Sequence, residues 1–392
     1  MLDLPPHLRA LLDADIPRFS AGEMKRRRDL VASAMAEANA DHLVFCGYTR
    51  AGSSVQWLTQ WPVTNEALGV FTPGLPDALF VQYVNHAPLA RRFAADAETV
   101  EWGGESSIRK VIEVLEKRGA KSGRVAVIGQ MPFEQHGALS EKFGKIVSLN
   151  RVYQRLRAVK SAEELDWLRI GAAMSDAGMA ALRDAIKPGV TERQLGDAIE
   201  RAYVPYGGMT NIHYIGTTSM HDSQIGVPRQ YPSNRKVQKG DVVVSEITAL
   251  FFDHGGQVLR SFTVGEEPTQ LYRDLHAAAD TALDAIFKVL KAGTTPAQVI
   301  AASNVIEGAG FTIIDDLVHG YGGGYLRPIL GSKSRPAGPV PEEPFRAGQT
   351  IVVQPNVVTP DRKAGVQTGQ LIVITETGVE SLQKFPRGFA RV

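Results

Sequence analysis

The stretch Gly240-Asp-Val-Val-Val-Ser-Glu246 returns later in the chain as Gly348-Gln-Thr-Ile-Val-Val-Gln354. In both copies a glycine precedes a run of β-branched residues, which is typical of a turn leading into a buried strand. Upstream of each copy stands a Lys-x-Gly-x-Thr turn, at 187–191 and 291–295, which indicates the start of a helix. We therefore predict two similar halves about a pseudo-twofold axis, with Glu246 and Gln354 at equivalent positions beside a central cleft.

The chain before this repeat has a different pattern, in which helical segments alternate with short apolar runs. Ser20 and Glu23 form the signature of a capping box before a predicted helix. Three apolar runs are predicted strands: 43–45, 79–81 and 125–128. A second capping box, Ser161 with Glu164, opens a long helix. We therefore predict an α/β domain over residues 1–155 and an α+β domain with the internal repeat over residues 156–392.

Composition limits the classes of function. The 392 residues include 43 Lys and Arg against 42 Asp and Glu, with a formal net charge of +1. The basic run Lys25-Arg-Arg-Arg28 lies in a helical pattern and reads as a solvated helix face, so no nucleic-acid partner is expected. Cys46 is the single cysteine, which excludes an intramolecular disulfide and a thiolate metal cluster. No signal sequence or membrane span is predicted, and we expect a cytoplasmic protein without a membrane partner.

Several motifs in the second domain resemble those of one enzyme family. They are Lys160-Ser-x-Glu-Glu, Arg235-Lys-Val-Gln-Lys-Gly-Asp241, His319-Gly-x-Gly322 and the tail Leu371-Ile-Val-Ile-Thr-Glu-x-Gly-Val-Glu380. Their order over residues 20–386 is similar to that in the creatinase, prolidase and methionine aminopeptidase family. The resemblance implies a pita-bread fold for the second domain. It also implies a homodimer in which the N-terminal domain of one subunit lies near the active site of its partner, with Tyr48, Thr49 and Arg50 supplying the contact.

The resemblance also identifies the positions that hold metal in other members. Metal-dependent members bind two divalent ions through two Asp, one His and two Glu, and these positions fall here on Glu246, Gln257, His319, Gln354 and Gly369. Two divalent ions carry four positive charges, and Glu246 is the only carboxylate left to offset them. We therefore expect no metal and no other cofactor.

Creatinase itself works without metal and uses a His as acid and base, which makes it the relevant comparison. The matching position is Arg229, which stays protonated at any working pH and cannot replace that base. Creatine is therefore not the expected substrate. His213, His221 and His254 lie in segments that border the cleft in relatives, and each remains open as the replacement or as a structural His.

From these positions we predict the residues of the site and their roles. Glu246 and His319 are the predicted catalytic pair, because a carboxyl and an imidazole in a cleft lined by amides can exchange protons. The predicted substrate-binding residues are Gln257 and Gln354 for polar groups, Arg229 and Arg327 for a carboxylate, Tyr325 as a wall or proton donor, and His254, His221 and Arg50 at the border of the cleft.

The function predicted from these residues is a metal-independent hydrolase or lyase. It would act on a carbon-nitrogen bond of a small polar nitrogen compound that carries a carboxylate, and its partner would be that small molecule. Two alternatives remain open at this point. One is an Xaa-Pro-type aminopeptidase with a single metal ion held by Glu246, His319 and a Gln, and the other is a non-catalytic binding protein on the same scaffold.

Overall fold

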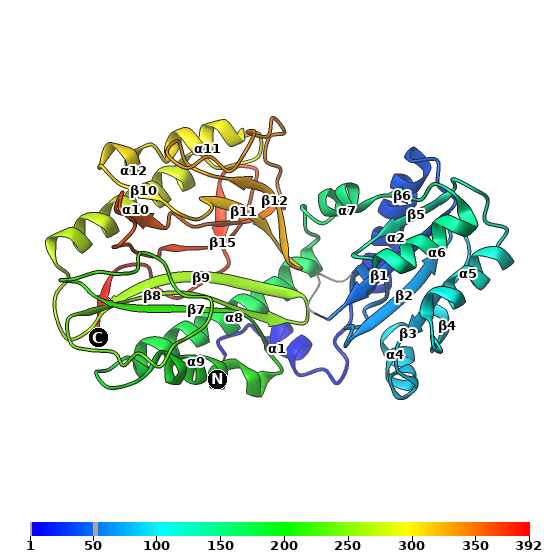
Figure 1. Ribbon diagram of the computed structural model, residues 1–392, viewed down its shortest axis with the longest axis horizontal. Helices are drawn as coiled ribbons and strands as arrows, with labels where there is room; N and C mark the ends of the chain where they lie inside the picture. Colours follow the sequence, from blue (N-terminus) through cyan, green and yellow to red (C-terminus); the bar gives the residue numbers. More distant parts are fainter. Residues whose placement is uncertain (1, 50–53, 96) are drawn as a thin grey trace. The chain divides into compact units, whose positions relative to one another are not determined.

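The computed structural model describes residues 2–49, 54–95 and 97–392. The chain forms two compact units, one made of residues 13–157 and the other of residues up to 12 together with 158–392 (Figure 1). The first helix therefore belongs to the unit that holds the internal repeat.

The N-terminal unit contains a six-stranded sheet in the order β4-β3-β2-β1-β5-β6. Its strands are β1 His42–Tyr48, β2 Glu66–Phe71, β3 Asp77–Val81, β4 Ala97–Trp102, β5 Val125–Ile128 and β6 Val147–Ser148. Its helices are α2 Ala21–Glu37, α3 Ser54–Thr59, α4 Ala87–Phe93, α5 Ser107–Lys117, α6 Phe133–Phe143 and α7 Asn150–Leu156. Strand β1 is antiparallel to β2 and parallel to β5, as expected for a mixed α/β sheet.

Local sequence explains these elements. The three predicted strands are confirmed, since 43–45 lies in β1, 79–81 in β3 and 125–128 forms β5. The Ser20 side chain accepts a hydrogen bond from the Glu23 N–H at 3.1 Å and caps α2.

Cys46 is buried in β1, where its thiol donates to the Ile128 carbonyl, and burial raises the pKa of this thiol to about 12. This supports a packing role for Cys46 and argues against a nucleophile.

The C-terminal unit contains a nine-stranded sheet, with β16 and β17 added to the path β12-β11-β13-β15-β9-β8-β7. The strands are β7 Met209–Ser219, β8 Asp241–Phe251, β9 His254–Thr263, β11 Val318–Tyr321, β12 Tyr325–Leu330, β13 Thr350–Val353, β15 Gly369–Ile374, β16 Val379–Ser381 and β17 Ala390–Arg391. A separate two-stranded sheet pairs β10 Thr312–Ile313 with β14 Val357–Val358. The helices are α1 Pro6–Leu12, α8 Ala162–Ala185, α9 Glu192–Tyr203, α10 Gln270–Val289, α11 Pro296–Ala302 and α12 Val305–Gly308.

The internal repeat is visible in this unit. Thr191 and Thr295 each close a complete capping box, and they open α9 and α11 respectively. The two matching β-branched runs lie in β8 and β13, so Glu246 is within β8 and Gln354 directly follows β13. In Figure 1, α8 and α9 lie on one side of strands β7 to β9, and α10 to α12 lie on the other side. Within the described residues, no helix is both long enough and apolar enough to cross a membrane.

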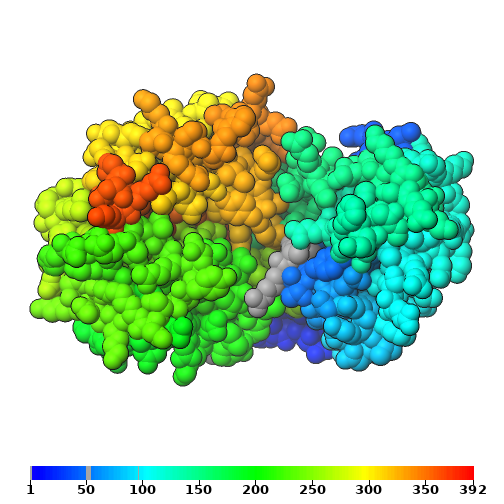
Figure 2. Space-filling view, viewed as in Figure 1, coloured from blue at the N-terminus to red at the C-terminus, as the bar shows by residue number. Residues whose placement is uncertain are grey.

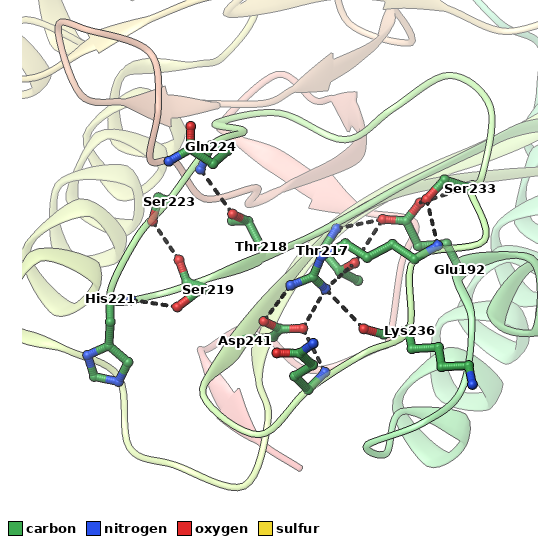
Figure 3. Close-up of polar contacts among 12 residues, drawn as sticks. Glu192, Thr217, Thr218, Ser219, His221, Ser223, Gln224, Ser233, Lys236 and Asp241 are labelled. Atoms are coloured by element: carbon green, nitrogen blue, oxygen red, sulfur yellow. Dashed lines mark hydrogen bonds and ion pairs between the residues drawn. The ribbon is translucent and has the colours of Figure 1, made fainter.

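The segment 220–240, which joins β7 to β8, is held by two buried carboxylates (Figure 3). Glu192 is fully buried and accepts hydrogen bonds from the N–H and hydroxyl groups of both Thr217 and Ser233, at 2.6 to 2.9 Å. Asp241 accepts two from Arg235, at 2.6 and 2.8 Å. The segment forms part of the green surface of this unit in Figure 2. These two carboxylates therefore hold the C-terminal half of the segment, through Ser233 and Arg235, close to β7 and β8.

Candidate active site

Glu246 lies in the middle of β8, a strand that is buried along most of its length. Its backbone is paired with Leu259 on β9 and with Tyr214 on β7. The side chain is 6% exposed, and its Oε1 accepts a hydrogen bond of 2.6 Å from Gln257 Nε2. Its hydrogen-bond partner is thus an amide. Arg260, on the neighbouring strand β9, donates to main-chain carbonyls that include that of Gly369.

Gln257 links Glu246 to the second half of the repeat. The same Nε2 donates to Gln354 Oε1 at 3.0 Å, and Gln354 Nε2 donates to the Asp316 carbonyl at 3.1 Å. Gln354 also interacts with the His319 ring. The structure therefore brings together four residues predicted from the sequence, in the chain Glu246, Gln257, Gln354 and His319.

His319 is held in β11 by contacts on several sides. Its Nδ1 lies 3.1 Å from the Gly320 carbonyl, and its ring stacks on Tyr325 with centroids 4.0 Å apart. Tyr325 donates its hydroxyl proton to the Asp316 carboxylate, which forms an ion pair with Arg335. In the described part of the chain, the buried Nε2 of His319 has no hydrogen-bond partner. This nitrogen is the atom available to accept a proton.

Burial shifts the two titratable groups in opposite directions. Burial raises the pKa of Glu246 to about 8, and the negative charge of Asp315 adds to the shift. Burial lowers the pKa of His319 to about 4, and its bond to the Gly320 carbonyl only partly offsets this. At neutral pH the Glu246 carboxyl therefore keeps its proton, while the His319 imidazole is neutral. The site contains an acid and a base but no net charge on this pair.

The donor set does not fit a pair of divalent ions. Among the residues that the structure describes, no group of three or more His, Cys, Asp and Glu side chains is placed to hold a metal. The amide nitrogen of Gln257, which cannot bind a cation, faces Glu246. At position 369 a Cβ atom would lie 2.5 Å from the Val353 carbonyl oxygen and 2.8 Å from the Gln354 Cα. Backbone therefore occupies the place where a fifth ligand would project.

Two more amides stand close to this chain of residues. Asn356 and Gln367 are each 1% exposed, and in the described residues neither side-chain O nor side-chain N of either amide has a hydrogen-bond partner. In the described residues, Gln257 Oε1 likewise has no hydrogen-bond partner. Leaving one such atom unpaired costs about 1–3 kcal/mol, and buried amides are normally bonded to protein, to a ligand or to ordered water. Partners outside the chain are the physical explanation for this arrangement.

The other predicted residues that the structure describes have the following contacts. Arg229 donates to Glu192 and Ser233, and His221 is exposed beside Glu266. Arg327 is exposed in β12, and His254 packs against Trp167 at the start of β9. His213 is bonded to the Tyr203 hydroxyl. Arg50 lies outside the described residues.

Sequence reasoning missed Asp315 and Asp316, which influence the site through charge and through hydrogen bonds to Gln354 and Tyr325. The adjacent pair of acids shortly before His319 was a visible signal. It also missed Asn356 as a buried amide, since a single Asn after a strand carries no recognisable pattern.

Comparison with known proteins agrees with this architecture. Residues 166–376 match the model of metallopeptidase family M24, and residues 27–159 match the creatinase/prolidase N-terminal domain. Creatinase of Bacillus sp. is 24% identical over 388 residues, covering 95% of this chain and 93% of that protein. The probable dipeptidase PepE of Mycobacterium bovis is 27% identical over 390 residues, covering 94% and 96%.

Solved structures show the same fold. The Xaa-Pro dipeptidase from Bacillus anthracis superposes with a TM-score of 0.80 at 17% identity, covering 94% of this chain and all of that one. Dipeptidase PepE from Mycobacterium ulcerans gives 0.77 at 23% identity, covering 96% and 99%. The predicted fold, an α/β domain followed by a pita-bread domain, is confirmed. The M24 match spans more than half of the chain, and the chain therefore belongs to metallopeptidase family M24, among its creatinase and prolidase type hydrolases.

Proposed function

We propose that this protein is a metal-independent hydrolase that cleaves a carbon-nitrogen bond of a small polar nitrogen compound. The observation that carries the proposal is the hydrogen-bonded path from Glu246 through Gln257 to Gln354, which interacts with His319, so that the side chains linking the acid to the base are amides. The family association supports a hydrolase acting on carbon-nitrogen bonds.

In the proposed reaction, Glu246 and His319 transfer the protons that hydrolysis needs. Neutral His319 accepts a proton at Nε2 from the attacking water, so that the oxygen can form a bond to the substrate carbon. Protonated Glu246 gives its proton to the nitrogen as the carbon-nitrogen bond breaks. The Gln257 N–H already donates to Glu246 Oε1 at 2.6 Å, and this bond strengthens as the carboxylate becomes charged. Return of the proton from His319 to Glu246 restores the starting state.

The two arginines that were predicted to bind a substrate carboxylate have other surroundings. Arg229 is engaged by the buried Glu192, and Arg327 has an exposed side chain. A lyase would use the same two groups without adding water to the product. Turnover in water enriched in oxygen-18 separates these outcomes, because only hydrolysis places the label in the product.

Metal analysis and mutation test the proposal together. Protein purified without chelators should contain far less than one divalent ion per chain, and chelator should leave its activity unchanged. Screening amides, ureas and lactams for released amine identifies a substrate. With that substrate, Glu246→Gln and His319→Asn should each lose about 100-fold or more of kcat, while the exposed Glu267→Gln serves as control.

Two results would refute this function. One is a stoichiometric ion whose removal abolishes turnover, which would support a metallo-aminopeptidase. The other is full turnover in both variants. A tightly bound compound that is always recovered intact would indicate a binding protein in place of an enzyme.

A further inference from the structure

The unpaired amides Asn356 and Gln367 are neighbours of the proposed catalytic chain. Asn356 follows Gln354 by two residues, and its N–H donates to the Gln354 carbonyl at 2.7 Å. Next to them, the Val366 N–H donates to the Val357 carbonyl at 3.0 Å, so the segments carrying Asn356 and Gln367 face each other.

The main chain of Gln367 is hydrogen-bonded to β9, the strand that pairs with the strand of Glu246. Its N–H donates to Ser261 Oγ at 2.7 Å, and that hydroxyl donates back to the Gln367 carbonyl at 3.1 Å. Ser261 is paired with Val244, two residues before Glu246 on β8. Side chains two apart on a strand share a face, so Ser261, and with it the main chain of Gln367, lies on the side of the sheet on which Glu246 and Gln257 meet.

The chemistry of the unpaired atoms defines what can complement them. Each of the two amides offers one acceptor and one pair of donors, whichever way its O and N are assigned. Gln257 Oε1 adds a third acceptor. A complementary ligand therefore needs both a carbonyl oxygen and N–H groups within a short distance.

We propose that Asn356, Gln367 and Gln257 form a binding wall for an uncharged planar amide or urea group, which is the substrate class of the site. This inference rests on the proposed function, because it places the scissile carbon-nitrogen bond of such a group beside Glu246 and His319. The group donates its N–H to the free acceptors and receives the free donors on its carbonyl oxygen.

Charged groups of the same shape fit less well. A carboxylate has acceptors only, so its oxygens cannot form hydrogen bonds with the three acceptor oxygens of the wall. An amidinium or guanidinium has donors only and faces the N–H groups of Asn356 and Gln367. A charge buried among these neutral amides would also lose its hydration.

A matched set of probes tests the inference with the full chain. Acetamide, acetate and acetamidinium have the same size and differ in charge and hydrogen bonding. Dissociation constants from ligand-observed NMR at about pH 6 should show acetamide binding at least about tenfold tighter than either ion. Methylurea should bind as acetamide does. Equal affinity for the three probes, or a preference for either ion, would overturn the inference.

Variants locate the binding. Asn356→Leu and Gln367→Met remove the unpaired atoms at nearly constant volume, and each should weaken acetamide by about tenfold or more. Gln349→Met, a buried amide before β13 whose Oε1 accepts the Arg346 N–H, is the matched control and should keep the wild-type preference. A crystal soaked in acetamide that shows only water at Asn356 and Gln367 would also overturn the inference.

The inference and the proposed function fail in different ways. Selective acetamide binding without turnover of any amide or urea would leave the binding wall in place and refute the hydrolase. Turnover that is lost in Glu246→Gln but unaffected by Asn356→Leu and Gln367→Met would support the hydrolase and refute the binding wall.

Discussion

Replacing Glu246 by glutamine should make the protein more stable in alkaline buffer and leave its stability in acid nearly unchanged. Glutamine has the shape of the protonated carboxyl and can still accept the bond from Gln257 Nε2. The two proteins therefore differ only in that wild-type Glu246 has to ionise as the pH rises, inside a site that is 6% exposed.

The sign follows from the direction of the pKa shift. The folded-state pKa of Glu246 is raised from 4.5 to about 8. The stability that this group contributes is thus complete below about pH 4.5 and is lost as the pH rises through about 8. A difference of this size in pKa corresponds to roughly 5 kcal/mol. We expect the advantage of Glu246→Gln to grow between these limits and then to level off at about 3–5 kcal/mol.

Urea unfolding measured by circular dichroism at intervals between about pH 5 and pH 9 checks this prediction. Hydrogen exchange of β8 peptides identifies the transition that belongs to the C-terminal unit. The exposed Glu267→Gln variant, whose side chain is 71% accessible, is the control and should differ from wild type by a constant small amount. A Glu246→Gln difference that is independent of pH would refute the reasoning, because it would mean that Glu246 is already ionised in the folded protein.

Three further predictions follow from the same contacts. The kcat/KM of the proposed reaction should be level between about pH 4 and about pH 8, since it needs neutral His319 and protonated Glu246; a profile that falls between these limits would contradict the assignment. Gly369→Ala should lower stability by about 1–3 kcal/mol in thermal unfolding, because its Cβ meets Gln354 and the neighbouring carbonyl; an unchanged midpoint would show that β13 moves freely. Glu192→Gln should cost about 2–4 kcal/mol in urea unfolding, because the buried carboxylate accepts bonds from both Thr217 and Ser233, and a loss below about 0.5 kcal/mol would contradict this.

Much of the fold could be predicted because its signals are local or repeated. Capping residues such as Ser161 act within one turn of helix, and the structure shows both bonds of that box. The repeat placed Glu246 and Gln354 at matching points of two strands, and they do share the amide of Gln257. The predicted roles of these residues, and the absence of metal, remain predictions.

What the sequence did not supply was the direction of individual side chains. Arg229 is adjacent in sequence to the cleft segments, yet it turns to Glu192, because a fully buried carboxylate attracts the nearest guanidinium. Gln367 stands two residues before the fifth ligand position in the sequence, but its unpaired state depends on contacts between segments far apart in the chain. Long-range packing decides such features, and no local pattern records it.

The crowded backbone at Gly369 limits how this protein can evolve. A mutation that introduced a carboxylate there would first have to displace the main chain of β13, so no single codon change restores a ligand at this position without damage. If growth in a laboratory selection were made to depend on metal binding at this site, compensating changes near Val353 should appear before any acidic residue at 369. Changes in main-chain packing around Gly369 would therefore have to precede any replacement of amide side chains by metal-binding carboxylates.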